Sequence, residues 1–310
     1  DEAALTLAVE AIAGGGILAL KGLGGYQLVV ASDDAAAVAT LRRRKRRPRK
    51  PFALMVRSLD SARALCRVSD AEAALLTSPA GPIVLLEEAG GVLAEAIAPG
   101  LRTLGVMLPT TPLHHLLLEA LKRPIVCTSG NVSEAAIAYD DAEALECLAG
   151  IADLWLTHDR PIVRPLDDSV ARVIDDAPQV LRIGRGLAPV VLSFDCGEPV
   201  LGSGATLKNT IAMAAGGRAV VSQHLGDLDD ACCLAAMHRT AADLGAFHRV
   251  TPVRRAVDAH PDCIAALDGP GATLPQTEVP HHLAHALAAL LEHGLEGPVL
   301  AFVWDGTGYG

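Results

Sequence analysis

A dense run of cations, RRRKRRPRK, occupies residues 42–50. It follows a helix-like segment, Asp34–Arg44, and precedes a strand-like one, Phe52–Val56. Cations at the end of a helix are favoured by the helix dipole, and clustered Lys and Arg side chains bind phosphate through charge-assisted hydrogen bonds. The run therefore suggests a polyphosphate site, although a solvated face or a nucleic-acid patch explains such a run at least as well.

A second polar segment, Thr128-Ser-Gly-Asn131, directly follows the strand-like stretch 124–127. It presents short hydroxyl and amide side chains at the carboxyl end of a strand, where α/β folds bind their ligands. Alone, the segment is a common turn. Its combination with the cations of residues 42–50 is more specific, because the two segments together offer one ligand both positive charge and hydrogen-bonding side chains.

Two histidines near the end of the sequence have the spacing of metal ligands. His281 and His285 open an Ala/Leu-rich stretch, residues 281–293, that reads as a helix. Side chains four residues apart share one helical face, so both imidazoles can reach one metal ion, although a helical His pair alone is more often surface decoration. Here Asp305 follows an apolar stretch, Val299–Trp304, predicted as a strand. It opens an Asp-Gly-Thr-Gly loop whose backbone amides suit phosphate.

The elements that position these residues alternate short apolar runs with helix-like segments, which indicates a mixed α/β domain over residues 1–194. Its predicted strands are Ile17–Leu20, Gln27–Val30, Phe52–Val56, Ile83–Leu86 and Ile125–Cys127, and its predicted helices include Asp34–Arg44 and Ser58–Cys66. A polar stretch, Phe194–Pro199, separates this domain from a second one, residues 195–310. The second domain opens with a strand at 199–202, a Gly-rich turn, and a strand at 211–215.

The composition excludes several classes of protein. The 310 residues are 51% hydrophobic and 20% charged, which supplies a large core for roughly two domains. No apolar run reaches the roughly 18 residues that cross a bilayer, and no export leader is recognisable, so we expect no membrane association and a cytoplasmic location. The seven cysteines form no Cys-x-x-Cys pair, which argues against a disulfide framework or a thiolate zinc site. The net charge of -10 disfavours general nucleic-acid binding.

The pairing of Lys45 and Arg47 with Ser129 and Asn131 resembles the Lys-x-Arg and Ser-x-Asn signature of the YrdC/TsaC family, which condenses a carboxylate-like acid with ATP. Further similarity covers residues 21–26, 104–109, 111–115, 160–163, 167–170 and 185–186. The resemblance implies a YrdC-like twisted mixed sheet with flanking helices, and a need for ATP and Mg²⁺. Adenylation requires cations that gather two anions and donors that orient the acid, which agrees with these residue types.

The same resemblance assigns roles to single residues. Lys45 and Arg47 would supply charge at the reacting phosphates, and Ser129 and Asn131 would orient the acid and the α-phosphate. The further nucleotide-binding candidates in this domain are Lys21, Lys50, Thr128, Asp168, Ser169 and Arg185. Asp168 and Ser169 would position Mg²⁺ or the ribose, and a purely structural turn at these two residues stays an open alternative.

The His-x-x-x-His pattern followed by a strand and Asp-Gly-Thr-Gly resembles the TsaD-like carbamoyl and threonylcarbamoyl transferases. This implies a partial actin-like (ASKHA) α/β lobe, in which His281, His285 and Asp305 hold a divalent metal, iron or zinc. The implied nucleotide contacts are Lys208 and Asn209 in the Gly-rich turn, with Gly306, Thr307 and Gly308. Residues 222–227 and 258–262 also match, although Asp258 and Asp262 are equally well explained as turn or capping residues.

A YrdC-like domain that precedes a TsaD-like domain is the order of HypF-type hydrogenase maturation proteins. That resemblance implies ATP-dependent formation of carbamoyl-adenylate from carbamate, itself derived from carbamoyl phosphate. The carbamoyl group would then pass to the C-terminal cysteine of HypE, on the route to [NiFe]-hydrogenase. The sequence starts with Asp and ends inside a phosphate loop, so we expect a fragment with a truncated second domain, able to form the adenylate but weak in transfer.

Two other functions stay open at this point. One is a TsaC-like synthase of threonylcarbamoyl-adenylate for tRNA modification, which shares the motifs of the first domain and leaves the second unexplained. The other is a non-catalytic RNA-binding module, in which residues 42–50 would contact the phosphates of double-stranded RNA. Such binding would weaken steeply with salt and be indifferent to ATP.

Overall fold

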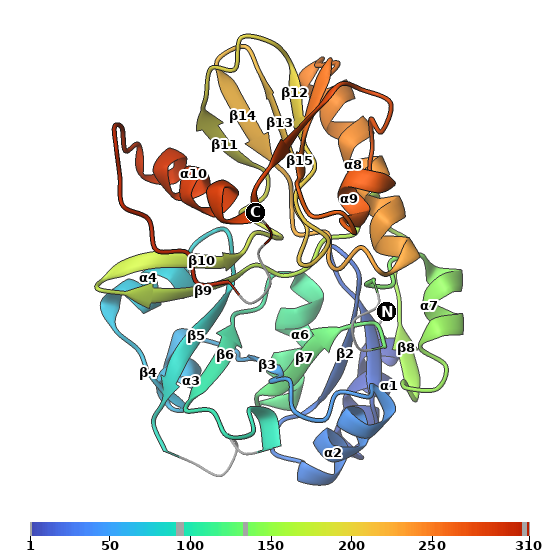
Figure 1. Cartoon of the computed structure of the whole chain (residues 1–310). Coiled ribbons are helices and arrows are strands. Elements are labelled where there is room, and N and C mark those ends of the chain that lie inside the picture. Colours follow the sequence, from blue (N-terminus) through green and yellow to red (C-terminus); the bar gives the residue numbers. More distant parts are fainter. Residues whose placement is uncertain (1, 91–95, 133–135, 306–308, 310) are drawn as a thin grey trace. The chain divides into compact units, whose positions relative to one another are not determined.

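The computed structural model describes residues 2–90, 96–132, 136–305 and 309. The chain forms two compact units, Asp1–Leu187 and Ala188–Gly310, each described here by itself (Figure 1). β11 (Val190–Ser193) belongs by packing to the second unit, because it pairs with β14 (Arg218–Val221). The sequence-based boundary after residue 194 stays a prediction for the functional domains.

The first unit is built on a mixed sheet. Its strands are β1 (Leu18–Lys21), β2 (Tyr26–Ala31), β3 (Ala53–Met55), β4 (Cys66–Arg67), β5 (Ile83–Glu88), β6 (Thr103–Met107), β7 (Ile125–Ser129), β8 (Leu154–Leu156), β9 (Val170–Ile174) and β10 (Ala177–Arg182). They lie in the order β10-β9-β5-β6-β3-β7-β2-β1-β8, with β4 beside β5. β2 and β7 are antiparallel, with Gln27 opposite Ser129. The sheet contains both parallel and antiparallel pairs, which confirms the predicted mixed α/β fold.

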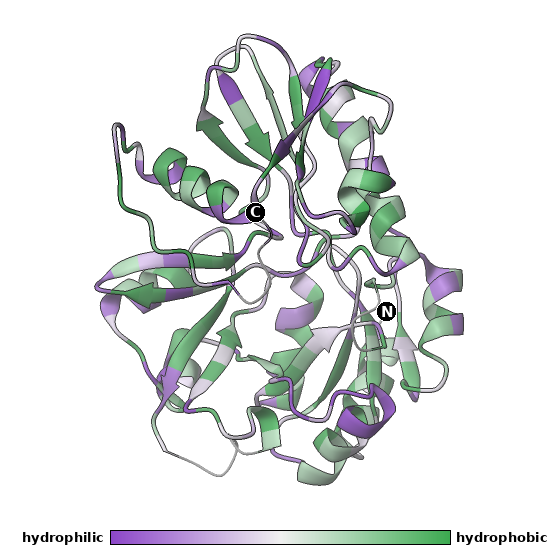
Figure 2. Cartoon of the chain, in the orientation of Figure 1, coloured by the Kyte–Doolittle hydropathy of each residue, from purple (hydrophilic) through white to green (hydrophobic). Residues whose placement is uncertain are grey.

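Helices cover both faces of this sheet because its central strands are apolar on both sides (Figure 2). α1 (Glu2–Ala13) and α6 (Pro112–Leu121) pack on one face, against Leu18 and Leu20. The opposite face, which includes Ala19, is covered by α2 (Ala35–Arg44), α3 (Leu59–Arg63), α4 (Asp70–Leu76) and α7 (Asp141–Cys147). Successive strand residues point to opposite faces, so each central strand contributes to both cores.

Local signals set the ends of the helices near the basic run. The Asp34 carboxylate caps α2 by accepting from the amides of Ala36 and Ala37, and Lys45 is the residue at its C-terminal end. The predicted helix 58–66 is shorter than expected. It ends at Arg63, because Cys66 leaves the helix to pair with Glu88 as part of β4.

The second unit contains a six-stranded sheet in the order β11-β14-β13-β12-β15-β16. The strands not yet given are β12 (Val200–Gly202), β13 (Ala212–Ala215), β15 (Arg254–Asp258) and β16 (Gln276–Val279). Its helices are α8 (Ala231–His248), α9 (Ile264–Leu267) and α10 (His281–His293). The predicted strands at 199–202 and 211–215 correspond to β12 and β13, and α10 has the predicted bounds.

The predicted strand Val299–Trp304 is wrong. In the structure this stretch is irregular, and Phe302 and Trp304 are 79% and 96% exposed. A β-strand exists only when it pairs with a neighbour, and β16 ends the order of the sheet without pairing to these residues in the described part of the chain. The apolar run alone was therefore not sufficient to predict a strand at residues 299–304. Among the described residues, no helix is long and apolar enough to cross a membrane.

Candidate functional site

The structure joins the two polar segments of the first unit at the amine of Lys45. The fully buried Lys45 Nζ donates to the carbonyl oxygens of Ser129 and Asn131, at 2.7 and 2.6 Å, and to the Asn131 side-chain oxygen. The Ser129 hydroxyl donates to that same side-chain oxygen at 2.8 Å. Three residues that the sequence predicted as catalytic therefore form one hydrogen-bonded cluster, at the end of α2 and of β7.

Arg47, the fourth predicted catalytic residue, ties the basic run to the same strand end. Its guanidinium donates to the Thr128 hydroxyl at 3.3 Å and to the Pro51 carbonyl, and it lies 5.1 Å from the centre of the Phe52 ring. Lys50 is exposed in the same loop. Thr128, near the end of strand β7, and Lys50, in the loop after α2, thus lie near the cluster, and their contact with a nucleotide stays a prediction.

Arg42 is a residue that sequence reasoning missed. Its guanidinium donates to the carbonyls of Ala96 and Ile97, at 2.8 and 2.7 Å, and to those of Arg47 and Lys50, at 3.1 and 3.0 Å. It also lies 4.3 Å from the centre of the Phe52 ring. Arg42 therefore holds the shape of the cationic loop. Its place on the last turn of α2 was visible in the sequence, but its partners were not.

The cluster concentrates positive charge in a partly dry environment. Burial, and then the nearby Arg47, lower the pKa of Lys45 to about 7. Burial, and then Arg42, lower the pKa of Arg47 to about 10. Both shifts mean that nearby negative charge does not fully offset the cost of burying the charged forms of Lys45 and Arg47. An anionic ligand would supply that negative charge, so its binding is favoured.

Binding of a polyphosphate ligand at this cluster is therefore expected to be accompanied by uptake of a proton at Lys45. A bound polyphosphate stabilises the ammonium form and raises the pKa from its value of about 7, so uptake occurs at about pH 8 and fades below about pH 6, where the amine is already charged. Calorimetry in buffers of different ionisation enthalpy measures this uptake. A Lys45→Met variant should lose it, and a binding enthalpy that is independent of buffer at about pH 8 would contradict the expectation.

Asp168 and Arg185 form an ion pair, with Asp168 Oδ1 2.9 Å from Arg185 Nε. Both line a small cavity together with Ser129, and its volume of about 20 Å³ admits about one water molecule. Arg185 also donates to the carbonyls of Ala80 and Gly81. The structure thus brings Asp168 and Arg185 to the wall that carries Ser129.

Ser169 and Lys21 have local partners. The fully buried Ser169 hydroxyl donates to the Arg185 carbonyl and accepts from the Gly184 amide, both at 2.9 Å. The Lys21 ammonium, 4% exposed, donates to the His158 carbonyl at 2.9 Å and pairs with Asp141 at 2.8 Å. These contacts support the neighbouring loops, and a direct contact of either residue with a nucleotide stays a prediction.

Asp141 is a second residue missed from the sequence. Hydrogen bonds from Lys21 and Tyr26 lower the pKa of its carboxyl group, and it begins α7. Burial and the Asp141 carboxylate raise the pKa of Tyr26 in turn. The Asp140-Asp141 pair at a helix start reads only as a cap, and its link to β1 and β2 depends on tertiary contacts.

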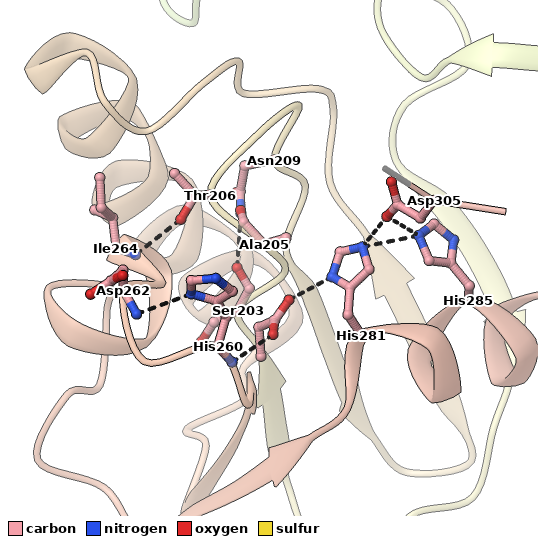
Figure 3. A network of polar contacts seen from close by, with 11 residues as sticks. Ser203, Ala205, Thr206, Asn209, His260, Asp262, Ile264, His281, His285 and Asp305 are labelled. Carbon is pink, nitrogen blue, oxygen red and sulfur yellow. Dashed lines mark hydrogen bonds and ion pairs between the residues drawn. The ribbon is translucent and has the colours of Figure 1, made fainter. Parts of the chain in front are cut away.

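In the second unit, His281, His285 and Asp305 converge as predicted (Figure 3). Asp305 Oδ2 lies 2.6 Å from His281 Nε2 and 3.3 Å from His285 Nε2. The two Nε2 atoms lie 3.1 Å apart. A turn of α10 supplies both histidines, and the stretch after it brings Asp305 to them.

This donor set fits a divalent transition metal. Two nitrogens at about 2.1 Å from one tetrahedral ion lie about 3.4 Å apart, close to the separation found here. Two imidazoles and one carboxylate suit zinc or iron, and a fourth position would stay available to another ligand. The hydrogen bond with Asp258, and then the contact with Asp305, raise the pKa of His281. The carboxylates of Asp258 and Asp305 both contact this imidazole, and a bound metal ion would reduce the repulsion between these negative charges.

Asp258, at the end of β15, orients His281. Its Oδ2 lies 2.6 Å from His281 Nδ1, and its Oδ1 accepts from the His260 amide at 2.8 Å. The second contact is the turn role left open from the sequence, and the first is a contact with one of the predicted metal ligands. Because a carboxylate accepts the proton on Nδ1, Nε2 keeps its lone pair for a metal.

Asp258→Asn should weaken zinc binding about tenfold, since the neutral amide supports the ligand imidazole less well. Competition with a chromophoric chelator measures the affinity. The matched control is Asp262→Asn, an exposed carboxylate in the same loop. Equal affinities for Asp258→Asn and the unmodified chain would show that Asp258 serves the turn alone.

The Gly-rich turn lies in the same cleft as His281, His285 and Asp305. Asn209 is buried and donates to the carbonyls of Ser203 and Ala205, at 2.9 and 2.6 Å, so it shapes the turn from inside (Figure 3). The exposed Lys208 donates its backbone amide to Asp227. Residues 204–210, His281, His285 and Asp305 line a cleft of about 1180 Å³. Gly306, Thr307 and Gly308, also predicted to bind nucleotide, lie outside the described residues.

Comparison with known proteins agrees with this two-part organisation. Residues 10–184 match the Sua5/YciO/YrdC family, described as telomere recombination, and residues 195–292 match the HypF Kae1-like domain. A YrdC-like domain followed by a Kae1-like, actin-like domain is thus the class of protein that the fold defines. A crystal structure of full-length HypF, in a phosphate- and nucleotide-bound form, superposes with a TM-score of 0.95 and 42% identity, covering 99% of this chain and 49% of that one.

Two curated relatives are named carbamoyltransferase HypF. The one from Synechocystis sp. is 44% identical over 311 residues, which cover 99% of this chain and 40% of the relative. The one from Rhizobium leguminosarum bv. viciae is 43% identical over 305 residues, which cover 96% and 40%. The chain spans about two fifths of the length of these relatives. It belongs to the HypF carbamoyltransferase family.

Proposed function

We propose that the first unit forms carbamoyl-adenylate from carbamate and ATP. The observation that supports this most is the Lys45 cluster, where a buried amine is bonded to the uncharged oxygens of Ser129 and Asn131 in the described part of the chain. Arg47 adds a second cation beside it. Such a site favours an anionic substrate and neutralises the charge that develops during transfer of an adenylyl group.

In the proposed reaction a carboxylate oxygen of carbamate attacks the α-phosphorus of ATP. The new oxygen–phosphorus bond gives carbamoyl-adenylate, the bond between the α- and β-phosphates breaks, and pyrophosphate leaves. Lys45 and Arg47 balance the charge on the leaving group, and Ser129 and Asn131 orient the acid. Mg²⁺ would accompany the ATP phosphates, and Arg185 would contact them from the wall of the cavity.

We further propose that the second unit takes part in transfer of the carbamoyl group. The thiolate of the C-terminal cysteine of HypE would attack the carbamoyl carbon, forming a carbon–sulfur bond while the bond to AMP breaks. A divalent metal held by His281, His285 and Asp305 would supply Lewis acidity toward the carbamoyl or phosphate oxygen. Carbamoyl phosphate would be the source of carbamate. The seven cysteines form no disulfide among the described residues, and this, with the need for ATP, suits the cytoplasm.

The test is a direct comparison of two acids. The chain is incubated with ATP, Mg²⁺ and either carbamate or threonine plus bicarbonate, and both pyrophosphate and the mass of any adenylate are followed. Carbamoyl-adenylate from carbamate alone supports the proposal. A threonylcarbamoyl product would move the function to the TsaC-like reaction, and no ATP turnover with either acid would reject adenylation.

A further inference from the structure

A chain of buried polar groups leads from the core of the first unit to the wall of its small cavity. His114, in the first turn of α6, is 1% exposed and lies among apolar neighbours such as Leu117 and Leu118. Its Nε2 lies 3.0 Å from the side-chain oxygen of Gln27 in β2. Gln27 Nε2 in turn lies 3.1 Å from Asp168 Oδ2. A buried imidazole in an otherwise apolar helix face needs a reason, since an apolar residue would pack there at less cost.

The direction of every hydrogen bond in this chain follows from one backbone amide. The N–H of Thr110 points at His114 Nδ1, at 3.4 Å, and the Thr110 hydroxyl lies 3.3 Å from the same nitrogen. A hydroxyl can donate or accept, but a backbone N–H can only donate. His114 Nδ1 must therefore carry the lone pair. Burial lowers the pKa of His114 to about 4, so the ring is neutral and its single proton is on Nε2. That proton is donated to the Gln27 oxygen, which turns the Gln27 amide nitrogen toward Asp168.

Asp168 receives donors on both oxygens as a result. Gln27 donates to Oδ2, and Arg185 donates to Oδ1 at 2.9 Å. If the Gln27 amide turned over, its oxygen would face the Asp168 carboxylate and repel it. The imidazole of His114 prevents this, because in its Nε2–H form it accepts nothing at that position.

We propose that His114 is a positioning residue that, through Gln27, fixes Asp168 and with it the guanidinium of Arg185 at the nucleotide site. Gln27, His114, Asp168 and Arg185 all line the cavity that Ser129 also lines. The inference rests on the proposed function for its effect on ATP. The hydrogen-bond chain itself does not depend on that function.

Two substitutions separate this role from simple packing. His114→Leu removes the donor and should raise the KM for ATP about tenfold with little change in kcat, the effect of one lost hydrogen bond in a buried network. His114→Gln places an amide N–H where Nε2–H stood, and it should restore most of the affinity. The control is His115→Leu, on the exposed face of the same helix, which should leave the KM unchanged.

Gln27→Glu tests the next link and keeps the size of the side chain. It sets a carboxylate against Asp168, so it should raise the KM for ATP at least as much as His114→Leu. Equal KM values for Gln27→Glu and the unmodified chain, or a loss in His114→Gln as large as in His114→Leu, would overturn the proposal.

Nitrogen-15 NMR of the histidine side chains supplies a readout that needs no turnover. The unmodified chain should show a neutral His114 with its proton on Nε2, and Thr110 should retain its amide hydrogen bond to Nδ1. A proton on Nδ1 would refute the chain of donors whatever the kinetics show. Absence of ATP turnover in the unmodified chain would instead reject the proposed function and leave the tautomer to decide the positioning role.

Discussion

Lys45→Met is expected to reduce carbamate-dependent pyrophosphate release by about a thousandfold. Removal of one preorganised group that stabilises charge in a transition state typically lowers the rate by about this factor. The amine is the group on which the oxygens of Ser129 and Asn131 converge, so no neighbour can replace it. Release of pyrophosphate by the variant and by the unmodified chain is measured at saturating ATP and carbamate.

The same substitution should change stability little, because two effects oppose each other. It removes a buried charge, and it also removes the donor to the oxygens of Ser129 and Asn131. Burial lowers the pKa of Lys45 to about 7, which means that the folded protein disfavours the charge that the unfolded chain carries freely. An apolar side chain of similar length removes that cost, which is present in full below about pH 7 and fades as the pH rises toward the ordinary pKa of lysine. A large loss of activity with a nearly unchanged Tm near neutral pH is therefore the result expected for a catalytic lysine.

Arg43→Met is the matched control for Lys45→Met, because it removes a neighbouring, exposed cation of the same run. It should retain nearly all of the activity. A Lys45→Met variant that keeps more than about a tenth of the activity would show that the amine does not act on the reacting phosphates.

His281→Ala is expected to weaken zinc binding at least a hundredfold. Removal of a residue that only supports a metal ligand weakens binding by up to about a hundredfold, and removal of a ligand itself should cost at least as much. His281 Nε2 is the atom that lies near both other donors, at 2.6 Å from Asp305 and 3.1 Å from His285. Metal content after dialysis against zinc and competition with a chelator give the affinity. Release of pyrophosphate should be unchanged, because the Lys45 cluster belongs to the other unit.

His282→Ala is the control for this substitution, since His282 is the next residue of α10 and is exposed. It should bind zinc as the unmodified chain does. If His281→Ala and His282→Ala bind zinc equally well, the three converging side chains are a hydrogen-bonded cluster and not a metal centre.

Residue spacing predicted those parts of both sites that lie on single elements. His281 and His285 are one helical turn apart, and Ser129 and Asn131 follow the end of one strand, so local geometry alone presents each pair on one side. The family resemblance also predicted that Lys45 and Asn131 belong to one site, but it did not predict the direct hydrogen bond between them.

The parts that sequence reasoning missed depend on contacts between distant segments. Gln27 and His114 are separated by 87 residues, and Arg42 reaches carbonyls 54 and 55 residues away. In both cases, no local sequence pattern at one residue indicates which distant residue it contacts. The strand predicted at Val299–Trp304 was wrong for the opposite reason: its apolar pattern was clear, but no strand in the described residues pairs with it.

The pairing of β2 with β7 limits how this family can vary. Gln27 lies opposite Ser129, and Ala31 lies opposite Ile125. Because side chains alternate between faces, inserting or deleting one residue in either strand would turn every later side chain to the wrong face of the sheet. The acceptor of Lys45 and the link to Asp168 would then separate. Substitutions between Ile125 and Ser129 can keep this register, whereas a change in the length of this segment would break the register and disrupt the site.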